Sequence, residues 1–342
     1  MSGGVDSAVA AYLLLQAWYE VIAGFMKNYA DESNPTCHTK EDRDTAIQVA
    51  QFLWISTVII FDFRKEYDER IIQYIYNWYK SWYTPNPDVL CNSQVKFDIF
   101  LEAAIKLWCD AIATGHYARI RQDEAGLFHL LKGVDTNKDQ SYFLSWLNQY
   151  QLSKSIFPLG EMTKPQVRAL AATIQLPNAT RKDSQGLCFI GKVPMKTFLQ
   201  KHLPLQPGVI KDTAWKQLGQ HDGYYFYTIW QREGLGLAWW PRYVVSKDIA
   251  ANEIIVGRKE EIALYNNRLT ATQRHRVWAA YPLPLTAMSK IRYRQEDQVV
   301  TILPHTDAIV EVVFEVPQRA ISAGQTIAIY EGDDLIASGI IQ

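Results

Sequence analysis

The sequence predicts an α/β fold in which a doubly wound parallel-sheet nucleotide-binding domain is followed by a small β-rich domain and a C-terminal β-barrel. Three observations lead to this prediction. Helical and strand-like segments alternate over the first third of the chain, which is typical of a parallel sheet covered by helices. A glycine loop opens the chain directly before a helix, and the last quarter carries short strands at regular spacing. The 342 residues are long for one core, so we expect domains at 1–195, 196–263 and 264–342.

The first domain is expected to alternate between helices and strands. Hydrophobic periodicity predicts helices at 7–17, 41–53, 66–80 and 95–107, and strands at 20–26, 55–61 and 110–114. Two prolines predict an extended segment over 84–92. Ligands of such sheets lie beyond the carboxyl ends of the strands, which is where Met26, Cys91, Gly115 and His116 fall.

The remaining elements follow in order. Residues 119–134 suggest a hairpin, and a helix is expected near Thr163, where Thr-Lys-Pro-Gln supplies a cap, a first-turn proline and a glutamine for a capping box. A polar loop covers 181–191. Short strands are expected at 223–229 and 253–256, with a turn at Gly234-Leu-Gly236, and barrel strands at 269–277, 288–293, 298–303, 308–314 and 326–330.

The opening loop predicts a phosphate site. Its residues are Ser2, Gly3, Gly4, Val5, Asp6 and Ser7. They offer backbone N–H groups and small hydroxyls at a helix start, the geometry that holds phosphate. No Gly-Lys-Ser/Thr closes the loop and it lacks Gly-x-Gly-x-x-Gly spacing, so it is neither a Walker A nor a dinucleotide motif. A nucleotide is the expected ligand.

Hydropathy, net charge and cysteine content limit the classes of protein to which the chain can belong. The chain has no apolar run of ~18 residues and no secretory leader before the loop. We therefore expect a soluble, cytoplasmic protein that does not associate with a membrane. The net charge of −1 excludes coating of nucleic acid by bulk charge but leaves room for a local basic patch. Four scattered cysteines form neither a disulfide framework nor a zinc motif, so no metal site is expected from them.

Two of these cysteines are candidates for chemistry. Cys91 and Cys188 each lie in a turn-rich polar segment, where a thiolate nucleophile would be accessible. Cys109, beside a strand start, is expected to be a packing residue. Cys37, in Asn-Pro-Thr-Cys-His-Thr, is ambiguous: its surroundings form no metal motif, and the simplest interpretation is a loop thiol.

Several blocks together resemble one family. Ser-Gly-Gly-Val-Asp-Ser is similar to the pyrophosphate loop of ATP pyrophosphatases, which adenylate a substrate oxygen. With Asn-Pro-Asp-Val-Leu-Cys-Asn, Ala-Thr-Gly-His-Tyr-Ala, Lys-Asp-Gln-Ser-Tyr-Phe-Leu and Lys-Asp-Ser-Gln-Gly-Leu-Cys-Phe-Ile-Gly, the chain resembles the tRNA-specific 2-thiouridylase family over essentially its whole length.

The resemblance implies ATP-dependent thiolation of the anticodon wobble uridine of tRNA through an adenylated uridine. It implies that ATP with Mg²⁺ is held by residues 2–7, Met26 and Gly115. Sulfur from a cysteine desulfurase or relay protein would travel as a persulfide on Cys188, and Cys91 would attack it or help release sulfide, leaving a Cys91–Cys188 disulfide. Asn86, Pro87 and Asp88 would surround the target base, with Asp88 placed for a hydrogen bond or proton transfer; without the resemblance, Asp88 could equally be a helix N-cap.

Further matches imply tRNA contacts. They are His116, Lys138, Asp139, Gln140, Arg292, Tyr293 and Gln325.

Two alternatives remain: another pyrophosphatase-loop enzyme, such as a 4-thiouridine or lysidine synthase or an amide-forming synthetase, and a catalytically impaired tRNA-binding relic. The paired cysteine blocks count against the first, and both cysteines with Asp88 count against the second.

Two departures from the family pattern give further expectations. The strand that precedes the loop in the family is missing, so we expect the true start codon to lie upstream. Glycine makes up only 18 of 342 residues while tryptophan reaches 11, and tryptophan stands where glycine is expected at Trp18, Trp54, Trp82, Trp108, Trp230 and Trp239. Three of these positions directly follow predicted helices, so we expect that the source reads UGA as glycine.

Overall fold

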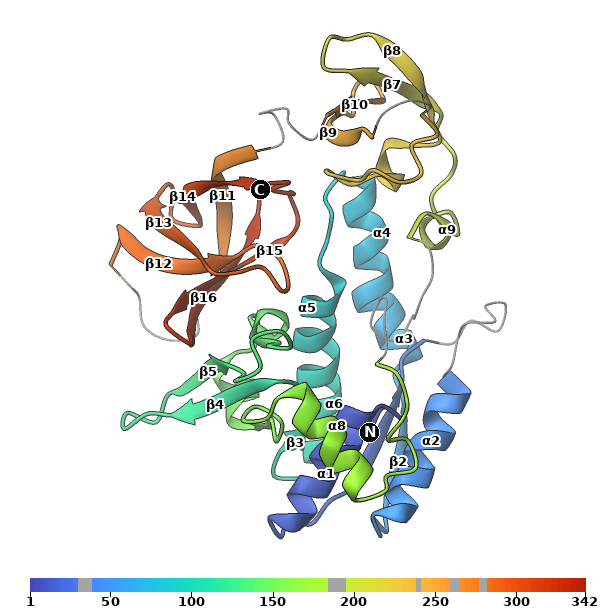
Figure 1. The fold of residues 1–342 in the computed structure, drawn as a ribbon, viewed down its shortest axis with the longest axis vertical. Helices are drawn as coiled ribbons and strands as arrows, with labels where there is room; N and C mark the ends of the chain where they lie inside the picture. Colours follow the sequence, from blue (N-terminus) through green and yellow to red (C-terminus); the bar gives the residue numbers. More distant parts are fainter. Residues whose placement is uncertain (30–38, 184–194, 238–240, 259–264, 277–281) are drawn as a thin grey trace.

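The computed structural model describes residues 1–29, 39–183, 195–237, 241–258, 265–276 and 282–342. Its three parts are shown in Figure 1: a helical first domain around the N-terminus, a small sheet at the opposite end of the molecule, and a barrel beside them. No helix in these ranges is long and apolar enough to cross a membrane.

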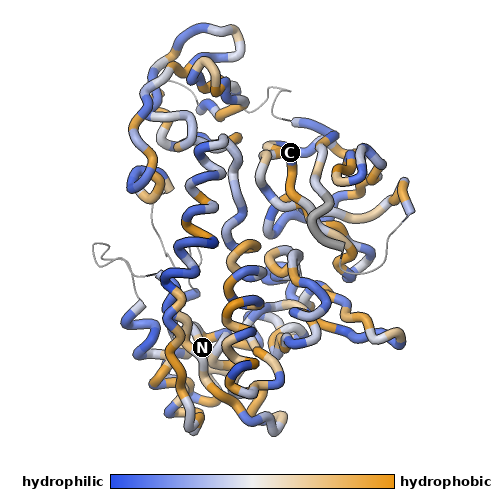
Figure 2. The backbone as a smooth tube through the Cα atoms, turned by 180° about the vertical axis from the view of Figure 1, so that it is seen from behind, coloured by the Kyte–Doolittle hydropathy of each residue, from blue (hydrophilic) through white to orange (hydrophobic). Residues whose placement is uncertain are grey.

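The first domain has the predicted parallel pairing, in two pieces. Strand β1 (Ala23–Lys27) pairs with β2 (Val58–Asp62), and β3 (Ile112–Ala113) pairs with β6 (Ser155–Ile156). The helices around them are α1 (Val5–Gln16), α2 (Thr39–Phe52) and α8 (Lys164–Thr173). Small buried residues let these helices approach closely: Ala8 and Val9 of α1 share one core cluster with Val49 of α2 and Ala171 of α8. Figure 2 shows the hydrophobic stretches gathered in this part of the chain.

Two long helical stretches lead away from the sheet. The first consists of α3 (Arg64–Tyr67), a π-helical turn η1 (Asp68–Ile72) and α4 (Gln73–Lys80). The second consists of α5 (Pro87–Cys91), η2 (Asn92–Ile99) and α6 (Phe100–Lys106). The expected extended segment over 84–92 is therefore wrong beyond Asn86. Pro87 occupies the first helical position, where its missing N–H is not needed, and the Asn86 side chain caps the helix by accepting from Val89 N at 3.3 Å.

A connecting region links the sheet to the barrel. It contains the predicted hairpin, β4 (Ala118–Gln122) with β5 (Phe128–Lys132), then η3 (Ser141–Leu144) and α7 (Gln149–Ser153). The predicted start of α8 is confirmed: Gln166 accepts a hydrogen bond from Thr163 N at 2.7 Å, and Pro165 lies in the first turn.

The small β-rich domain begins after α9 (Met195–Leu199). Its strands β7 (Gly208–Asp212), β8 (Gln217–His221), β9 (Tyr243–Asp248) and β10 (Glu253–Gly257) pair in the order β8-β7-β10-β9. The strand expected at 223–229 is wrong: Tyr224–Phe226 form a 3₁₀ turn, η4. All of residues 224–227 are buried against α4, so they lack the alternating solvent face that a strand at a sheet surface has.

The barrel closes through β11 with β16. Its strands are β11 (Tyr265–Arg276), β12 (Leu285–Lys290), β13 (Gln298–Pro304), β14 (Ile309–Arg319), β15 (Thr326–Glu331) and β16 (Asp334–Ile341), and β5 joins the same sheet against β16. The five predicted strands are present. Strand β16 was missed because Gly339 suggests a turn, but a Cβ at Gly339 would lie 2.2 Å from Thr272 O, so the glycine serves close strand packing.

Candidate active site

The opening loop is folded back on itself at the start of α1. Ser2 N and Ser2 Oγ each lie 3.1 Å from Ser7 Oγ, and Ser7 Oγ donates to Gly4 O at 3.1 Å. Gly4, the residue before the helix, has no side chain to cap the first turn. The helix start therefore presents backbone N–H groups and two hydroxyls in one small concave turn, as an anion site requires.

Two glycines allow the rest of the chain to pack against this loop. Gly3 has a φ of +75°, and a Cβ there would lie 2.6 Å from Asp42 O. A Cβ at Gly115, just beyond β3, would lie 2.7 Å from the Asp6 carbonyl carbon and 2.8 Å from Ser7 N. The predicted nucleotide residue Gly115 therefore lies directly against the loop, at the carboxyl end of β3.

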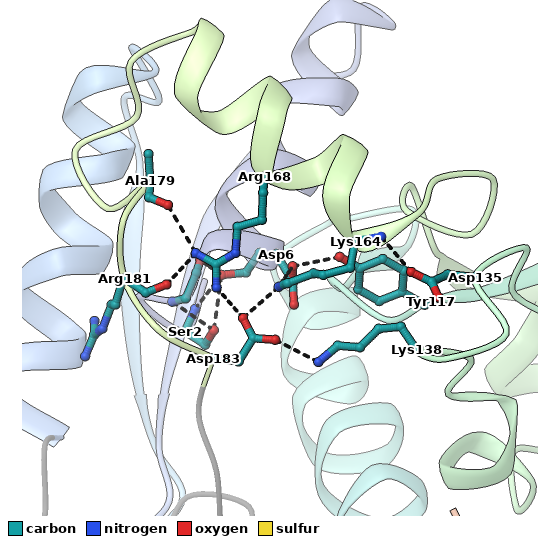
Figure 3. Close-up of polar contacts among 12 residues, drawn as sticks. Ser2, Asp6, Tyr117, Asp135, Lys138, Lys164, Arg168, Ala179, Arg181 and Asp183 are labelled. Carbon is teal, nitrogen blue, oxygen red and sulfur yellow. Dashed lines mark hydrogen bonds and ion pairs between the residues drawn. The ribbon is translucent and has the colours of Figure 1, made fainter. Parts of the chain in front are cut away.

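A cluster of charges borders the same loop (Figure 3). Asp183 accepts from Lys138 at 2.8 Å, from Lys164 at 2.8 Å and from Arg168 at 2.5 Å. Lys164 also lies 2.6 Å from Asp6 of the loop. Burial opposes ionisation of Asp183, but its hydrogen bonds to Lys138 and Lys164 outweigh this and hold its pKa below the usual range. Lys164 thus contacts the predicted phosphate loop directly, and Lys138 and Arg168 are linked to Lys164 through Asp183.

Tyr117 and Arg181 fix the loop from either side. The Tyr117 hydroxyl donates to Asp6 at 2.9 Å, and burial together with the Asp6 charge raises the pKa of Tyr117, so the group stays a donor. Arg181 donates to Gly3 O at 3.2 Å and pairs with Asp42, while Asn178 donates to Gly3 O at 2.9 Å. The loop is therefore held in shape by four side chains from other parts of the chain, those of Tyr117, Lys164, Asn178 and Arg181.

Sequence reasoning missed Lys164, Arg168, Asp183, Tyr117 and Arg181 as site residues. The signal for Lys164 was present, because the Thr163 cap and Pro165 place it in the first turn of α8. What the sequence did not show is that this helix start meets the start of α1, a packing contact between residues far apart in the chain.

The Asn86, Pro87 and Asp88 block lies at the start of α5. Asn86 is the helix cap and its Nδ2 donates to Tyr142 OH at 3.4 Å, while Asp88 lies in the first turn and is partly exposed. The alternative role of N-cap therefore belongs to Asn86 and not to Asp88. Gln325, expected on the tRNA surface, donates to Thr84 O at 2.8 Å and so joins the barrel to the segment that leads into this block.

Cys91 ends α5 and is fully buried among core side chains. The expectation of an accessible edge position is wrong for this residue, because the polar segment before it folds into a helix that turns Cys91 inward. Cys188 and Cys37 lie outside the described residues, as does Trp239. Cys109 packs against the core as predicted, and burial together with Asp110 raises the pKa of its thiol.

The α5–η2–α6 helix connects the block to the loop. Phe97 lies six residues after Cys91, roughly 9 Å along a helix, and its ring centroid is 5.9 Å from that of His116. His116 follows Gly115, and its Nδ1 lies 2.7 Å from Thr114 Oγ1. Burial, with Lys96 nearby, lowers the pKa of His116 well below its usual range, so the ring is neutral.

Comparison with known proteins identifies the family. Residues 1–192 match the model described as tRNA methyl transferase HUP domain, 196–258 its PRC-barrel domain and 266–341 the aminomethyltransferase beta-barrel domain. The chain is 46% identical over 349 residues to the tRNA-specific 2-thiouridylase MnmA of Shouchella clausii, covering all of this chain and 94% of that protein. It is 44% identical to the proteins of the same name from Lacticaseibacillus paracasei and Cupriavidus taiwanensis, covering all of this chain and 92% and 97% of theirs. The chain belongs to the tRNA-specific 2-thiouridylase family.

Within this 2-thiouridylase fold, the expected tRNA residues of the first domain have partners inside the chain. Lys138 pairs with Asp183, Asp139 is buried and accepts from Gly133 N and Ser141 N at 3.1 Å each, and Gln140 Oε1 accepts from Tyr117 N at 3.1 Å. These contacts shape the turn that carries Tyr117 to the loop.

The expected barrel residues of the 2-thiouridylase lie near one another. Arg292 donates to Arg319 O, and burial, with Arg319 beside it, lowers the pKa of the Arg292 guanidinium. The Tyr293 ring lies 4.5 Å from that of Phe143, and Arg294 covers its other side at 5.3 Å. Met26, the remaining expected nucleotide residue, lies partly buried near the carboxyl end of β1. No group of three or more metal-ligating side chains occurs in the described part of the chain.

Proposed function

We propose that the chain is an ATP-dependent tRNA 2-sulfurtransferase that converts the wobble uridine of tRNA to 2-thiouridine. The observation that carries the proposal is the pyrophosphate loop at the start of α1, bordered by Lys164, Arg168 and Lys138, in a chain that matches curated 2-thiouridylases over its full length. The matching family model is described as a tRNA methyl transferase. A loop for pyrophosphate favours thiolation, since methyl transfer needs no adenylation.

ATP is needed because the C2 oxygen of uracil is a poor leaving group. The first step transfers AMP to that oxygen and releases pyrophosphate. Residues 2–7 and Gly115 would hold the phosphates, and Met26 would contact the nucleoside. The cations at Asp183 would stabilise charge that develops on the leaving pyrophosphate. Mg²⁺ that enters with ATP would find its preferred oxygen ligands in the phosphates and in Asp6.

The sulfur step involves both cysteines. A cysteine desulfurase or relay protein would leave a persulfide, Cys188–S–SH. In one route, attack of the Cys91 thiolate on the inner sulfur forms the Cys91–Cys188 disulfide and releases HS⁻, which adds to C2 while AMP departs. In the other route, the terminal persulfide sulfur adds to C2 first, and Cys91 then cleaves its S–S bond to Cys188. Either route leaves a disulfide that an external thiol must reduce with two electrons. Asp88, which lies in the first turn of α5, would hydrogen-bond the base.

The tRNA would contact the first domain and the barrel together. Gln325 and Tyr142 already join the barrel to the Asn86 block, since Tyr142 OH donates to Thr326 O at 2.9 Å. Arg292 and Tyr293 lie close to this junction, since Tyr142 and Phe143 of η3 contact Ile291 O and the Tyr293 ring. A cytoplasmic location and a sulfur-relay partner complete the proposal.

Nucleoside mass spectrometry tests the function directly. We expect that tRNA incubated with the protein, ATP, Mg²⁺ and a sulfide source yields 2-thiouridine at the wobble position, with one pyrophosphate released per thiolation. Omission of ATP should abolish the product. Formation of 4-thiouridine or lysidine would favour another pyrophosphatase-loop enzyme, and tRNA binding without any modified nucleoside would favour the relic.

A further inference from the structure

Asn28 is a buried amide without a partner at the edge where the nucleotide is expected. This residue is 2% exposed, and neither Oδ1 nor Nδ2 has a hydrogen-bond partner among the described residues. Leaving a buried donor and acceptor unpaired is destabilising by about 1–3 kcal/mol each, so native proteins rarely keep such a group without a use for it.

The position of Asn28 indicates what that use is. It lies just beyond the carboxyl end of β1, two residues after Met26, and a strand places residues i and i+2 on the same face. Helix α1 runs away from the loop and β1 returns to the same edge of the sheet, so Asn28 lies at the edge where residues 2–7 begin the helix.

We infer that Asn28 binds the adenine of ATP; this inference rests on the proposed function. An amide presents one donor and one acceptor side by side, which matches the paired N6 donor and ring-nitrogen acceptor of adenine. With the phosphates at residues 2–7, the base must extend along the carboxyl edge toward β1. The unpaired amide is thus satisfied only when nucleotide is present.

Binding measurements on Asn28→Leu test this inference. Leucine has the same number of side-chain heavy atoms and the same branching as asparagine but no polar atoms. We therefore expect ATP to bind at least tenfold more weakly, about 1.4 kcal/mol, while inorganic pyrophosphate binds as it does to wild type. Removing the unpaired amide should leave the melting temperature of the ligand-free protein unchanged or higher. Ser289→Ala, which removes another buried unpaired group in the barrel, should leave ATP affinity unchanged.

Equal ATP affinity in wild type and Asn28→Leu would overturn the inference. If Asn28→Leu fails to fold, Asn28→Ser, which is smaller and polar, serves for the same comparison. A wild-type protein that binds pyrophosphate and tRNA but not ATP would overturn the proposed function itself, together with this role for Asn28.

A second inference rests on a separate observation, the backbone of the tryptophans. Six of the eight described tryptophans adopt a left-handed conformation, with φ values of 63° at Trp18, 58° at Trp54, 65° at Trp82, 64° at Trp108, 63° at Trp215 and 74° at Trp230. Only four other non-glycine residues do so in the described ranges. For a bulky residue this conformation is a genuine outlier, and here it is the rule for one residue type.

Four of these tryptophans end helices in the same way. After α1, Trp18 N donates to Leu15 O at 3.1 Å and Tyr19 N donates to Leu14 O at 3.0 Å. The same pair of bonds follows α2 at Trp54, α4 at Trp82 and α6 at Trp108. This is the Schellman motif, whose left-handed residue is usually glycine because glycine has no Cβ.

Packing does not compensate for the strain at three of the six positions, whereas Trp82 and Trp230 stack on the rings of Tyr83 and Tyr243. The side chains of Trp18, Trp54 and Trp108 are 95%, 93% and 94% exposed. Trp215, which the sequence analysis did not identify, lies in the β7–β8 hairpin, where Trp215 N donates to Asp212 O at 2.9 Å. Short hairpin loops favour glycine at their left-handed position. Trp78 and Trp146, the two described tryptophans with ordinary backbone conformations, pack against aromatic or core side chains.

We propose that the six left-handed tryptophans, and Trp239 by its sequence pattern, are glycine in the native protein because its gene specifies glycine with UGA. A translation that reads UGA as tryptophan would produce this replacement at glycine positions alone. The proposal concerns the chain itself and is independent of its activity.

Codons and peptides from the source test this proposal. We expect UGA at codons 18, 54, 82, 108, 215, 230 and 239, UGG at codons 78 and 146, and peptides of the native protein that carry glycine at the former positions. UGG codons with tryptophan-containing peptides at the left-handed positions would overturn it.

Recombinant variants give a second readout. Trp18→Gly, Trp54→Gly and Trp108→Gly should each raise the apparent melting temperature by roughly 2–4 °C, whereas Trp146→Gly, which removes a partly buried indole, should lower it. Equal or lower stability of the three exposed variants would contradict the assignment.

Discussion

We expect replacement of Cys188 with alanine to abolish both thiolation and persulfide labelling of the enzyme. The expected loss is complete, because in the proposed function Cys188 is the residue that accepts sulfur from the donor, and the described thiols Cys91 and Cys109 are buried or packed against the core. Incubation with a cysteine desulfurase and labelled cysteine, followed by gel analysis without reductant, measures the persulfide, and tRNA nucleoside analysis measures the product.

Cys91→Ala should separate the two steps. Product formation with the physiological donor is lost, yet Cys188 still acquires a persulfide, since Cys91 acts only after sulfur has arrived. The matched control is Cys109→Ala: this thiol packs beside the core and burial raises its pKa, so thiolation should stay at the wild-type rate. Normal 2-thiouridine formation by Cys91→Ala would refute the two-cysteine scheme.

The burial of Cys91 adds a constraint on this chemistry. The thiol is enclosed by core side chains at the end of α5, so sulfur chemistry there is shielded from water and from external oxidants. The same helix starts with Asn86 and Asp88, which places the target-base block and Cys91 within about one helical turn. The residues proposed to bind the base and the Cys91 thiol are therefore carried by one short helix.

The fold was predictable where local pattern decides structure. Alternation of periodic segments predicted α1, β1, α2, β2 and the start of α8, and turn spacing predicted five of the barrel strands, because these signals depend only on neighbouring residues. The segment 224–227 was mispredicted because four aromatic residues suggest a strand, while packing against α4 buries all of them.

The site was predictable only as separate motifs. The loop, the Asn86 block and Gly115 each carry a local pattern, and the structure brings Gly115 against the loop. The cations were not predictable as a cluster: Lys164 and Arg168 lie one turn apart on α8, but no sequence spacing relates them to Lys138 or to Asp183, on which all three converge. Asn28 was missed for the same reason: an unpaired buried amide is a property of packing and not of spacing.

Lys164 is expected to contribute most among the cations. It touches both Asp6 of the loop, at 2.6 Å, and Asp183, at 2.8 Å, and its backbone N–H donates to Asp135 at 2.7 Å, so the start of α8 is fixed against the loop. When ATP occupies the loop, phosphate oxygens can take the place of these carboxylates as partners of the ammonium group. The cation would then lie beside the bond that breaks.

Lys164→Ala should therefore slow adenylation by about 10²-fold, the typical effect of removing one preorganised electrostatic contact to a transition state. Single-turnover release of pyrophosphate, measured with saturating ATP and tRNA, gives this rate. Lys182→Ala removes an exposed lysine next to Asp183 and should leave the rate unchanged. If Lys164 served only to neutralise Asp6 and Asp183, the variant would melt at a lower temperature while its adenylation rate stayed near wild type. A large loss of rate with tRNA affinity and melting temperature retained instead assigns the lysine to the departing pyrophosphate.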